Sequence, residues 1–462
     1  MTPTRFGLVL VGVLALGGCA ASDPSVPFTD IGKTTSERLG GSEVRWTRDS
    51  KDEATSQEAI GRLLEAPLSE SNAVRIALLN NQRLQAEYEE IGIAHADLVQ
   101  AGLLENPSVS VDILTGNGAV SPSFSVVQNV FGLLTLSARR TMASSTLDRA
   151  KYAVGAKILD TAAEVRVAYY KLVGDQQAAD LFQKVVSATQ AAADLAERQV
   201  NAGNLNRRDQ ALQQAQYAEA VLELARIETQ LSADREVLNR LLGLHGEQIA
   251  WNLPDRLPDV PSSKLELDGL ETLAVEHRLD LAGARADLQT ATYALDLGQQ
   301  LRWLTALGLG VTIERDPESG AWLKGPKVEF TLPLFDFGGA RIASLEAQQR
   351  KGGKLFAALA VDVRSEVREA YIRLTAAQEA AMFYQTQILP LRQQILAENQ
   401  RLYNGMLVGV YDLLRSRQDQ INSARDYIGV LKDYWMARSQ MEKALAGPLP
   451  VTSPAVPSPK SP

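Results

Sequence analysis

The sequence predicts a mainly α-helical fold with short β-strands, made of two copies of one unit: helix, β-hairpin, long helical hairpin. One observation is an internal repeat, because the pattern E-V-R-x-A-Y-x-x-L occurs at residues 164–172 and again at 366–374. Another is helical periodicity that continues for about 65 residues, from 137 to 201, whereas globular helices usually have roughly 8–20. A third is the aromatic content of only 6%, which suits long helices better than a globular core.

The repeat predicts two copies of about 180 residues each. Repeats determine the architecture before any single motif does. The downstream half recurs at a shift of 202 residues and the upstream half at a shift of 197, so one loop of the second copy holds about five extra residues. The matched pairs are Gly203/Gly405, Leu205/Leu407, Leu212/Leu414 and Gln216/Gln418 downstream, and Ala77/Ala274, Leu84/Leu281, Ala94/Ala291 and Leu98/Leu295 upstream.

Copy one is predicted to begin with a helix over about 68–104, which Asn106-Pro107 ends. Alternating apolar residues predict a strand over 109–115, and a turn separates it from a second strand at 123–131. The long helix over 137–201 follows. The turn Asn201-Ala202-Gly203-Asn204 then leads into a helix that returns to about residue 244.

Copy two repeats this plan with a helix over 268–304, a strand over 306–315 and a strand that ends near 332. Long helices to 404, with a kink at Pro390, and from 410 to 446 complete it. The strand over 109–115 has only seven residues and Pro326 interrupts the last strand, so the sequence predicts short hairpins.

The chain ends differ in character from the two copies. Arg5, an apolar run over 6–16 and Gly17-Gly18-Cys19 make a secretory signal that is too short to span a bilayer. The signal resembles a bacterial lipobox, which implies that Cys19 becomes a lipid-carrying N-terminus. Ala20, the next residue, resembles the pattern of bacterial lipoproteins that are sorted to the outer membrane. The expected organisation is signal peptide 1–18, N-terminal lipid-tethered arm 19–68 of irregular structure, repeat 69–255, repeat 264–447 and disordered Pro-rich tail 448–462.

Composition and motifs argue against an enzyme and against nucleic-acid binding. The net charge is −8, which is the wrong sign for a nucleic-acid partner. No HExxH, GxSxG, P-loop or CxxC pattern occurs, and His95, His245 and His277 are scattered, so we expect no catalytic residues, no metal and no cofactor. The narrow apolar seams and many polar helix residues are typical of packed antiparallel helices.

With its lipoprotein signal and two copies, the chain resembles the TolC-like outer-membrane efflux factor family over about 69–447. The resemblance also rests on L-P-L-F-D-F-G-G at 332–339, on Tyr403-Asn404-Gly405 and on Tyr411-Asp412-Leu413-Leu414. It implies a homotrimer in which each chain gives four strands to one 12-stranded β-barrel and its helices to a hollow α-barrel cylinder. Closure fits the physics, because open sheet edges are not tolerated in lipid.

The resemblance also implies a site at the periplasmic tips of the helical hairpins, where a periplasmic adaptor (membrane fusion) protein docks. The expected docking residues are Asn201, Ala202, Gly203, Asn204, Asn404, Gly405 and Met406, with both glycines as turn formers. Asp209 and Asp412 match the acidic residues that narrow the pore in the family, and Arg415 stands where a second acid sometimes occurs. Asp412 is seven residues after Gly405 but Asp209 is six after Gly203, a departure from strict repetition.

The function expected from these features is an outer-membrane exit duct of a tripartite efflux or type I secretion system, partnered by an inner-membrane pump. The alternative is a lipid-anchored periplasmic coiled-coil scaffold whose hairpins form no pore. The sequence leaves the cargo open among drugs, metal ions and proteins.

Overall fold

The computed structural model describes residues 23–450 except 117–118, 264, 304–305, 317 and 332–333. The expected signal peptide, Cys19 and residues 451–462 of the tail therefore lie outside the described residues. So do Asn117 and Gly118 of the first hairpin turn and the first two residues of the 332–339 motif.

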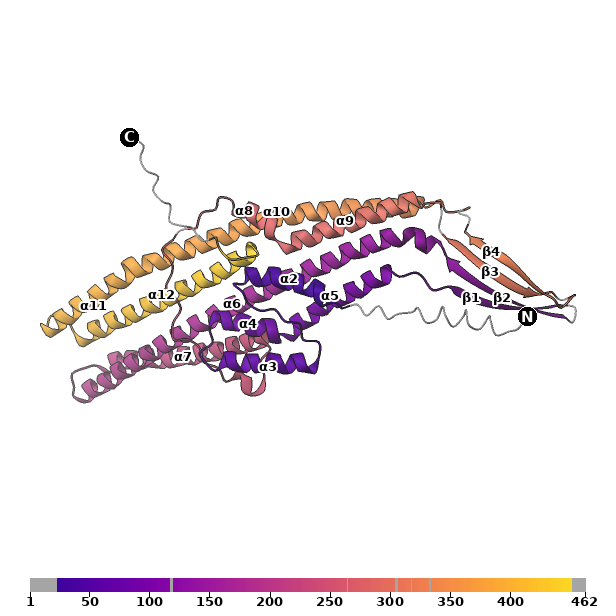
Figure 1. The fold of residues 1–462 in the computed structure, drawn as a ribbon. Helices are drawn as coiled ribbons and strands as arrows, with labels where there is room; N and C mark the ends of the chain where they lie inside the picture. Colours follow the sequence, from indigo (N-terminus) through magenta and orange to yellow (C-terminus); the bar gives the residue numbers. More distant parts are fainter. Residues whose placement is uncertain are drawn as a thin grey trace, which may run out of the picture. The chain divides into compact units, whose positions relative to one another are not determined.

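The chain divides into two compact units. Unit 1 combines residues up to Ile31 with Tyr88–Val154 and Asp280–Ala358, and unit 2 combines Gly32–Glu87, Gly155–Leu279 and the chain from Leu359 onward. Figure 1 labels the elements. In chain order they are α2 (Ser25–Arg38), α3 (Ser50–Leu64), α4 (Glu70–Asn80), α5 (Gln82–Ala101), β1 (Ser108–Gly116), β2 (Ala119–Asn129), α6 (Phe131–Asn201), α7 (Arg207–Leu242), the 3-10 turn η1 (Gly246–Ile249), α8 (Leu270–His277), α9 (Leu279–Gln300), β3 (Leu307–Arg315), β4 (Trp322–Phe330), α10 (Gly339–Phe383), the π-helical turn η2 (Tyr384–Ile388), α11 (Leu389–Asn404) and α12 (Val410–Ala444).

Unit 1 contains one four-stranded antiparallel sheet in the order β1-β2-β3-β4. The two hairpins predicted from the sequence are confirmed. The strands of the first hairpin are longer than expected, with nine residues in β1 and eleven in β2, whereas β3 has nine residues instead of the predicted ten. Pro326 does not interrupt β4, because it lies inside the ladder opposite Val311. Within one chain β4 is an edge strand of the sheet, the place in a sheet where proline is usually found.

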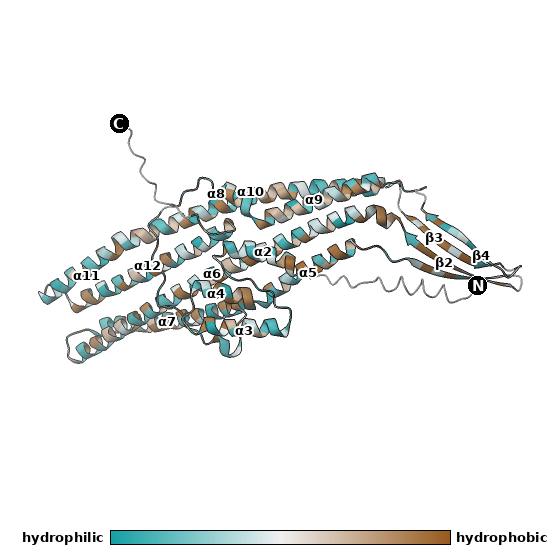
Figure 2. Cartoon of the chain, in the orientation of Figure 1, coloured by the Kyte–Doolittle hydropathy of each residue, from teal (hydrophilic) through white to brown (hydrophobic). Residues whose placement is uncertain are grey.

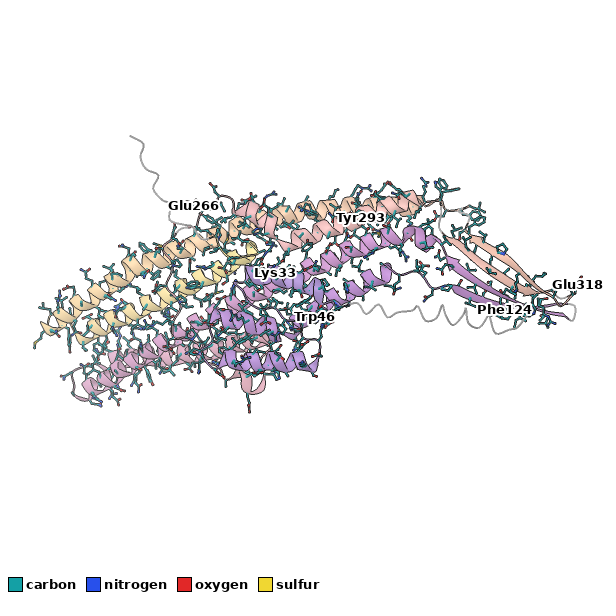
Figure 3. All side chains as sticks on the ribbon, viewed as in Figure 1. Lys33, Trp46, Phe124, Glu266, Tyr293 and Glu318 are labelled. Atoms are coloured by element: carbon teal, nitrogen blue, oxygen red, sulfur yellow. The ribbon has the colours of Figure 1, made fainter. Side chains whose placement is uncertain are left out.

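The sheet has one apolar and one polar face, and Figure 2 accordingly colours the strands both brown and teal. Residues that lie opposite each other in the register share a face. Phe124, labelled in Figure 3, lies 6.1 Å from Trp322 between ring centroids on the apolar face. The exposed apolar residues of that face are Val109, Val111, Ile113, Val120, Phe124, Val126, Leu309, Val311, Trp322, Val328 and Phe330.

The helices of unit 1 approach each other closely at a glycine. A Cβ at Gly298 of α9 would lie 2.8 Å from Leu345 Cδ1 of α10, so the Leu345 side chain would have to shift to accept any larger residue there. Further along the same pair, the Arg285 guanidinium lies 5.8 Å from the Phe356 ring centroid. The two helices are thus held by packing of small and aromatic side chains.

Two long helical hairpins, α6–α7 and α11–α12, belong to unit 2 near their turns. They share a core, because Ile421 of α12 packs with residues of the first hairpin, namely Phe182, Val185, Val186 and Ala220. None of the helices in the described part of the chain combines the length and apolar character that crossing a membrane requires.

The helix predicted over 68–104 is broken into α4 and α5, and the helix predicted over 268–304 is broken in the same way into α8 and α9. Asn81 causes the first break, since its side chain accepts hydrogen bonds from the backbone N–H of Arg83 and Leu84 and donates to the Leu241 carbonyl. Arg278 occupies the second break, 197 residues later, so the break is itself part of the repeat.

The N-terminal arm contains two helices, which corrects the prediction of an irregular segment over 19–68. Asp49 caps α3 by accepting hydrogen bonds from two backbone N–H groups, and Ile60 is fully buried. Phe28 and Ile31 of α2 are also buried. These few anchors fix short helices in which most of the other residues are polar.

Pro390 was predicted to kink the descending helix, and the π-helical turn η2 ends two residues before it. A proline removes a backbone donor and crowds the preceding turn, and a π-turn accommodates both effects. α6 is 71 residues long and carries no such turn. The two hairpins therefore differ in how their long helices are built.

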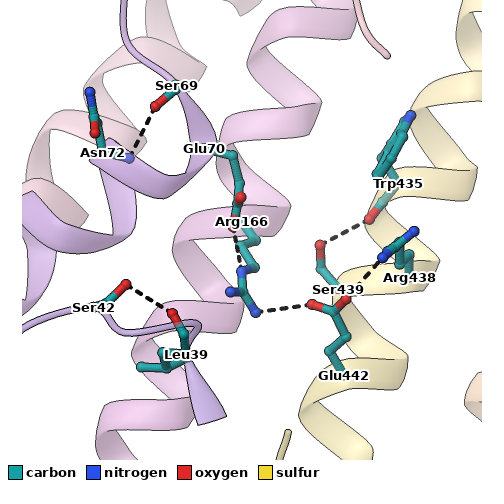
Figure 4. A network of polar contacts seen from close by, with 10 residues as sticks. All are labelled: Leu39, Ser42, Ser69, Glu70, Asn72, Arg166, Trp435, Arg438, Ser439 and Glu442. Carbon is teal, nitrogen blue, oxygen red and sulfur yellow. Dashed lines mark hydrogen bonds and ion pairs between the residues drawn. The ribbon is translucent and has the colours of Figure 1, made fainter. Parts of the chain in front are cut away.

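A polar network joins the two copies within unit 2 (Figure 4). The Arg166 guanidinium on α6 contacts Glu70 of α4 at 2.5 Å and Glu442 of α12 at 3.0 Å. Arg438 reaches the other Glu442 oxygen at 3.3 Å. Burial lowers the pKa of Arg438, but Glu442 and Tyr434 outweigh it and the pKa is raised. One arginine of the first repeat thus anchors the last helix of the second.

Candidate functional site

The candidate site is the pair of helical tips in unit 2, and the first tip reverses through glycine. Gly203 has φ +75°, and its N–H donates to the Val200 carbonyl at 2.9 Å. The Asn204 N–H donates to the Gln199 carbonyl at 2.8 Å. This pair of bonds with a left-handed residue is the Schellman helix end. The predicted role of Gly203 as a turn former is confirmed.

The second tip uses the same motif one residue later than predicted. Gly405 was predicted to form the turn as Gly203 does, but it has φ −80° and is not the left-handed residue. Met406 takes that position with φ +59°, and its N–H donates to the Tyr403 carbonyl at 2.9 Å. The Leu407 N–H donates to the Leu402 carbonyl, also at 2.9 Å. Gly405 is therefore the C-cap of α11, and Met406 takes the left-handed position that Gly203 holds in the first copy.

This offset explains the departure of the two acidic residues from strict repetition. Asn206 caps α7 by accepting from the Asp209 N–H at 2.9 Å, and Asn206 Nδ2 donates to Asp209 at 2.6 Å. Gly409 precedes α12, and its N–H donates to Asp412 at 3.1 Å. Both carboxylates lie at the third position of their helices and accept a hydrogen bond from the residue that precedes the helix. Asp209 and Asp412 are thus equivalent at a shift of 203.

Burial supports the shift of 203 along the returning helices. Equivalent buried positions are Ala220 and Ser423, Leu238 and Met441, and Leu242 and Leu445. The predicted pairs Leu212/Leu414 and Gln216/Gln418 are therefore displaced by one residue in the structure. The two copies therefore match better in which positions are buried than in which residues they carry at those positions.

A groove of about 500 Å³ lies between the two hairpins just above the tips. Asp412 and Arg415, two of the predicted constriction residues, line it together with Tyr411. The Tyr411 hydroxyl donates to Gln199 Oε1 at 2.7 Å and so links the second hairpin to the first. Burial and, next, the charge of Asp209 raise the pKa of Tyr411. The remaining lining residues are Val185, Ala188, Thr189, Ala192, Gln213, Gln216, Leu414, Gln418, Asp419, Ile421 and Asn422.

The two tips differ in chemistry. Asn201, Ala202 and Asn204 of the first tip are exposed and mostly polar. At the second tip Met406 is 93% exposed and Leu407 is 75% exposed. Leu407 was not among the predicted docking residues, although two consecutive apolar residues after a turn glycine were a readable signal.

Tyr411 was also missed as a contact between hairpins, because its partner Gln199 lies 212 residues away. Nothing in the local sequence indicates that pairing. Within the described ranges, no group of three or more His, Cys, Asp or Glu residues gathers where it could hold a metal ion.

Comparison with known proteins decides the fold. No family model matches the chain. The chain is 23% identical over 394 residues to the cobalt-zinc-cadmium resistance protein CzcC of Cupriavidus metallidurans, covering 82% of this chain and 90% of the relative. The Campylobacter jejuni CmeC outer membrane channel superposes with a TM-score of 0.70 at 14% identity, over 83% of this chain and 87% of that one.

The outer membrane protein VceC of Vibrio cholerae superposes with a TM-score of 0.68 at 16% identity, over 82% of this chain and 97% of that one. The chain has the fold of the TolC-like outer-membrane channels. The resemblance inferred from the sequence is thus confirmed, as is the mainly helical fold with one small sheet. Of these three proteins, CmeC is described as an outer membrane channel.

Proposed function

We propose that this protein is the outer-membrane exit duct of a tripartite export system, and that cargo passes through it passively from periplasm to exterior. The observation that carries the proposal is the four-stranded sheet, whose apolar face is exposed while its other face is polar. A water-exposed apolar face of this kind marks contact with lipid or a partner. The TolC-like fold supports the same function.

The duct is proposed to be a homotrimer. β1 pairs only with β2 and β4 only with β3 in the described sheet, so each protomer presents two open edges. Unpaired edges are not tolerated in a bilayer, and about eight strands is the usual minimum for a closed barrel. Three copies joined edge to edge would close twelve strands. Strands of nine to eleven residues have the length that a tilted spanning strand needs.

The remaining assignments follow from this proposal. The repeats 69–255 and 264–447 would form the trimeric cylinder, and lipid on Cys19 would add an outer-membrane anchor. The tips would dock the adaptor protein of an inner-membrane pump through Asn201, Ala202, Gly203, Asn204, Asn404, Gly405 and Met406. Asp209, Asp412 and Arg415 would set the charge at the periplasmic constriction.

Divalent metal ions are a second, narrower proposal for the cargo. The observation in favour is the name of the curated relative CzcC, a cobalt-zinc-cadmium resistance protein. A strain that lacks this protein should then be hypersensitive to cobalt, zinc or cadmium salts. Unchanged metal tolerance together with drug hypersensitivity would exclude metal cargo and leave the duct proposal standing.

Two measurements on purified protein test the duct. Native mass spectrometry in detergent should give three chains per particle, and planar bilayers should show stepwise conductance. A stable monomer without conductance would instead favour the periplasmic scaffold.

A further inference from the structure

We propose that the polar face of the sheet makes the duct favour cations over anions at the level of the strands. This inference rests on the proposed trimeric duct, in which that face lines the passage. It assigns a selectivity role to Asp112 and Glu314, two acids far from the periplasmic tips.

The register places these two acids on one rung of the sheet. Asp112 lies opposite Ser123, and Ser123 lies opposite Glu314. Two strand spacings of about 4.8 Å separate them. The Ser123 hydroxyl donates to Asp112 at 3.4 Å. Both acidic residues are exposed.

The other charges on this face cancel. Lys327 is the one basic residue of the polar face among the described strand residues, and it lies 3.9 Å from Glu329 on the same strand. Lys327 also donates to the Ser125 hydroxyl at 3.5 Å. Asp112 and Glu314 therefore leave an excess of two negative charges per chain, or six in a trimer. The bases Arg315 and Lys324 belong to the apolar face.

The uncharged residues between these acids are mostly small, so the acidic side chains reach farthest from the wall. The rung next to them holds Ser110, Ser125, Thr312 and Gly325. The larger neighbours are Leu323, which lies opposite Glu314 on the same rung, and Leu114, which lies two residues after Asp112. Few bulky groups stand between the carboxylates and the centre of the passage.

The proposed barrel is narrow enough for the electric field of these carboxylates to act on ions that pass through it. Twelve strands about 4.8 Å apart and tilted by about 40° give a backbone radius of about 12 Å. The carboxylates would then lie roughly one Debye length from the axis at 0.15 M salt, about 8 Å, and well beyond it at 1 M, about 3 Å. Selectivity should accordingly be strong in dilute salt and weaken in concentrated salt.

The experiment measures reversal potentials of single channels in planar bilayers under a roughly tenfold KCl gradient. The wild-type K⁺/Cl⁻ permeability ratio should exceed one. The double variant Asp112→Asn, Glu314→Gln should lower it toward one, by about twofold or more. Lys327→Gln should raise the ratio, because it removes the one base that this face carries among the described strand residues.

Arg315→Gln is the matched control, because Arg315 follows Glu314 in sequence but lies on the opposite face. It changes the charge of the chain and should leave the ratio unchanged. If the channels conduct but neither the double variant nor Lys327→Gln changes the K⁺/Cl⁻ permeability ratio, the inference is overturned and the proposed duct still stands. Absence of any channel would overturn the proposed function itself. If the double variant does not assemble, the direction of the Lys327→Gln effect decides.

Discussion

The sequence repeat aligns Gly203 with Gly405, but replacing each of them by alanine should affect the stability of its turn differently. Gly203 has φ +75° and Gly405 has φ −80°. Only the first backbone conformation is unfavourable for a residue with a Cβ.

Steric clashes do not complicate the comparison of the two substitutions. A Cβ at Gly203 would meet no atom within 4 Å, and a Cβ at Gly405 would lie 3.5 Å from the Arg401 and Leu402 carbonyl oxygens, an ordinary contact. Gly203→Ala should therefore destabilise its turn by about 1–2 kcal/mol from backbone strain alone. Gly405→Ala should be neutral or stabilising by up to about 1 kcal/mol, because alanine restricts the unfolded chain.

Hydrogen exchange of the purified protein, followed by mass spectrometry, measures these local effects. Peptides over 196–206 should exchange at least about fivefold faster in Gly203→Ala, the factor that corresponds to about 1 kcal/mol. Peptides over 399–409 should be unchanged or slower in Gly405→Ala. Equal acceleration at both tips, or a larger effect at Gly405, would refute the one-residue offset between the hairpins.

Three further predictions concern the tips and the junction of the repeats. Met406→Asn keeps a residue that tolerates the left-handed turn but removes an exposed apolar side chain, so adaptor crosslinking should fall while abundance stays constant; unchanged crosslinking would remove this side chain from the docking surface. Tyr411→Phe should loosen the link between hairpins by about 0.5–1.5 kcal/mol, seen as faster exchange at both tips, and no change would show that the hydroxyl contributes nothing. Arg166→Met leaves the carboxylates of Glu70 and Glu442 without their shared partner. It should lower the free energy of unfolding by about 2 kcal/mol, after allowance for partial exposure, and so lower the unfolding midpoint in urea. An unchanged midpoint would contradict the anchoring role of Arg166.

Alkaline pH provides a fourth prediction. Burial, and then the charge of Glu70, raise the pKa of Tyr169, whose hydroxyl donates to the Leu68 carbonyl. A raised folded-state pKa contributes stability that is full below the unfolded value of about 10 and is lost as pH rises above it. The unfolding temperature should fall above about pH 10, and Tyr169→Phe should flatten that fall. If the unfolding temperature falls equally steeply with pH in the wild type and in Tyr169→Phe, this prediction is contradicted.

The architecture could be predicted because long apolar seams and an internal repeat leave few alternatives. Gly203 could be identified as a turn former since a tight reversal favours a residue without a Cβ. Met406 could not, because methionine gives no signal for a left-handed backbone. The chance match of Leu212 with Leu414 hid the one-residue offset that burial reveals.

Other differences arose where tertiary contacts override local signals. The ends of β1 and β2 follow cross-strand hydrogen bonds, which extend pairing to Gly116 and Ala119, whereas side-chain alternation fades earlier. The helix break at Asn81 depends on its bond to the Leu241 carbonyl, far away in sequence. α3 could have been predicted from Asp49 followed by acidic residues in the first turn.

The central claim, that the polar face of the sheet lines a conducting path, is tested most directly by thiol block of neighbouring residues. Thr312 and Val311 are adjacent on β3 but lie on the polar and apolar faces respectively. A bulky charged thiol reagent should reduce single-channel current in Thr312→Cys, in up to three steps for three chains, and should leave Val311→Cys and the wild type unchanged. Block of Val311→Cys instead of Thr312→Cys, or the absence of current in all three proteins, would contradict the account.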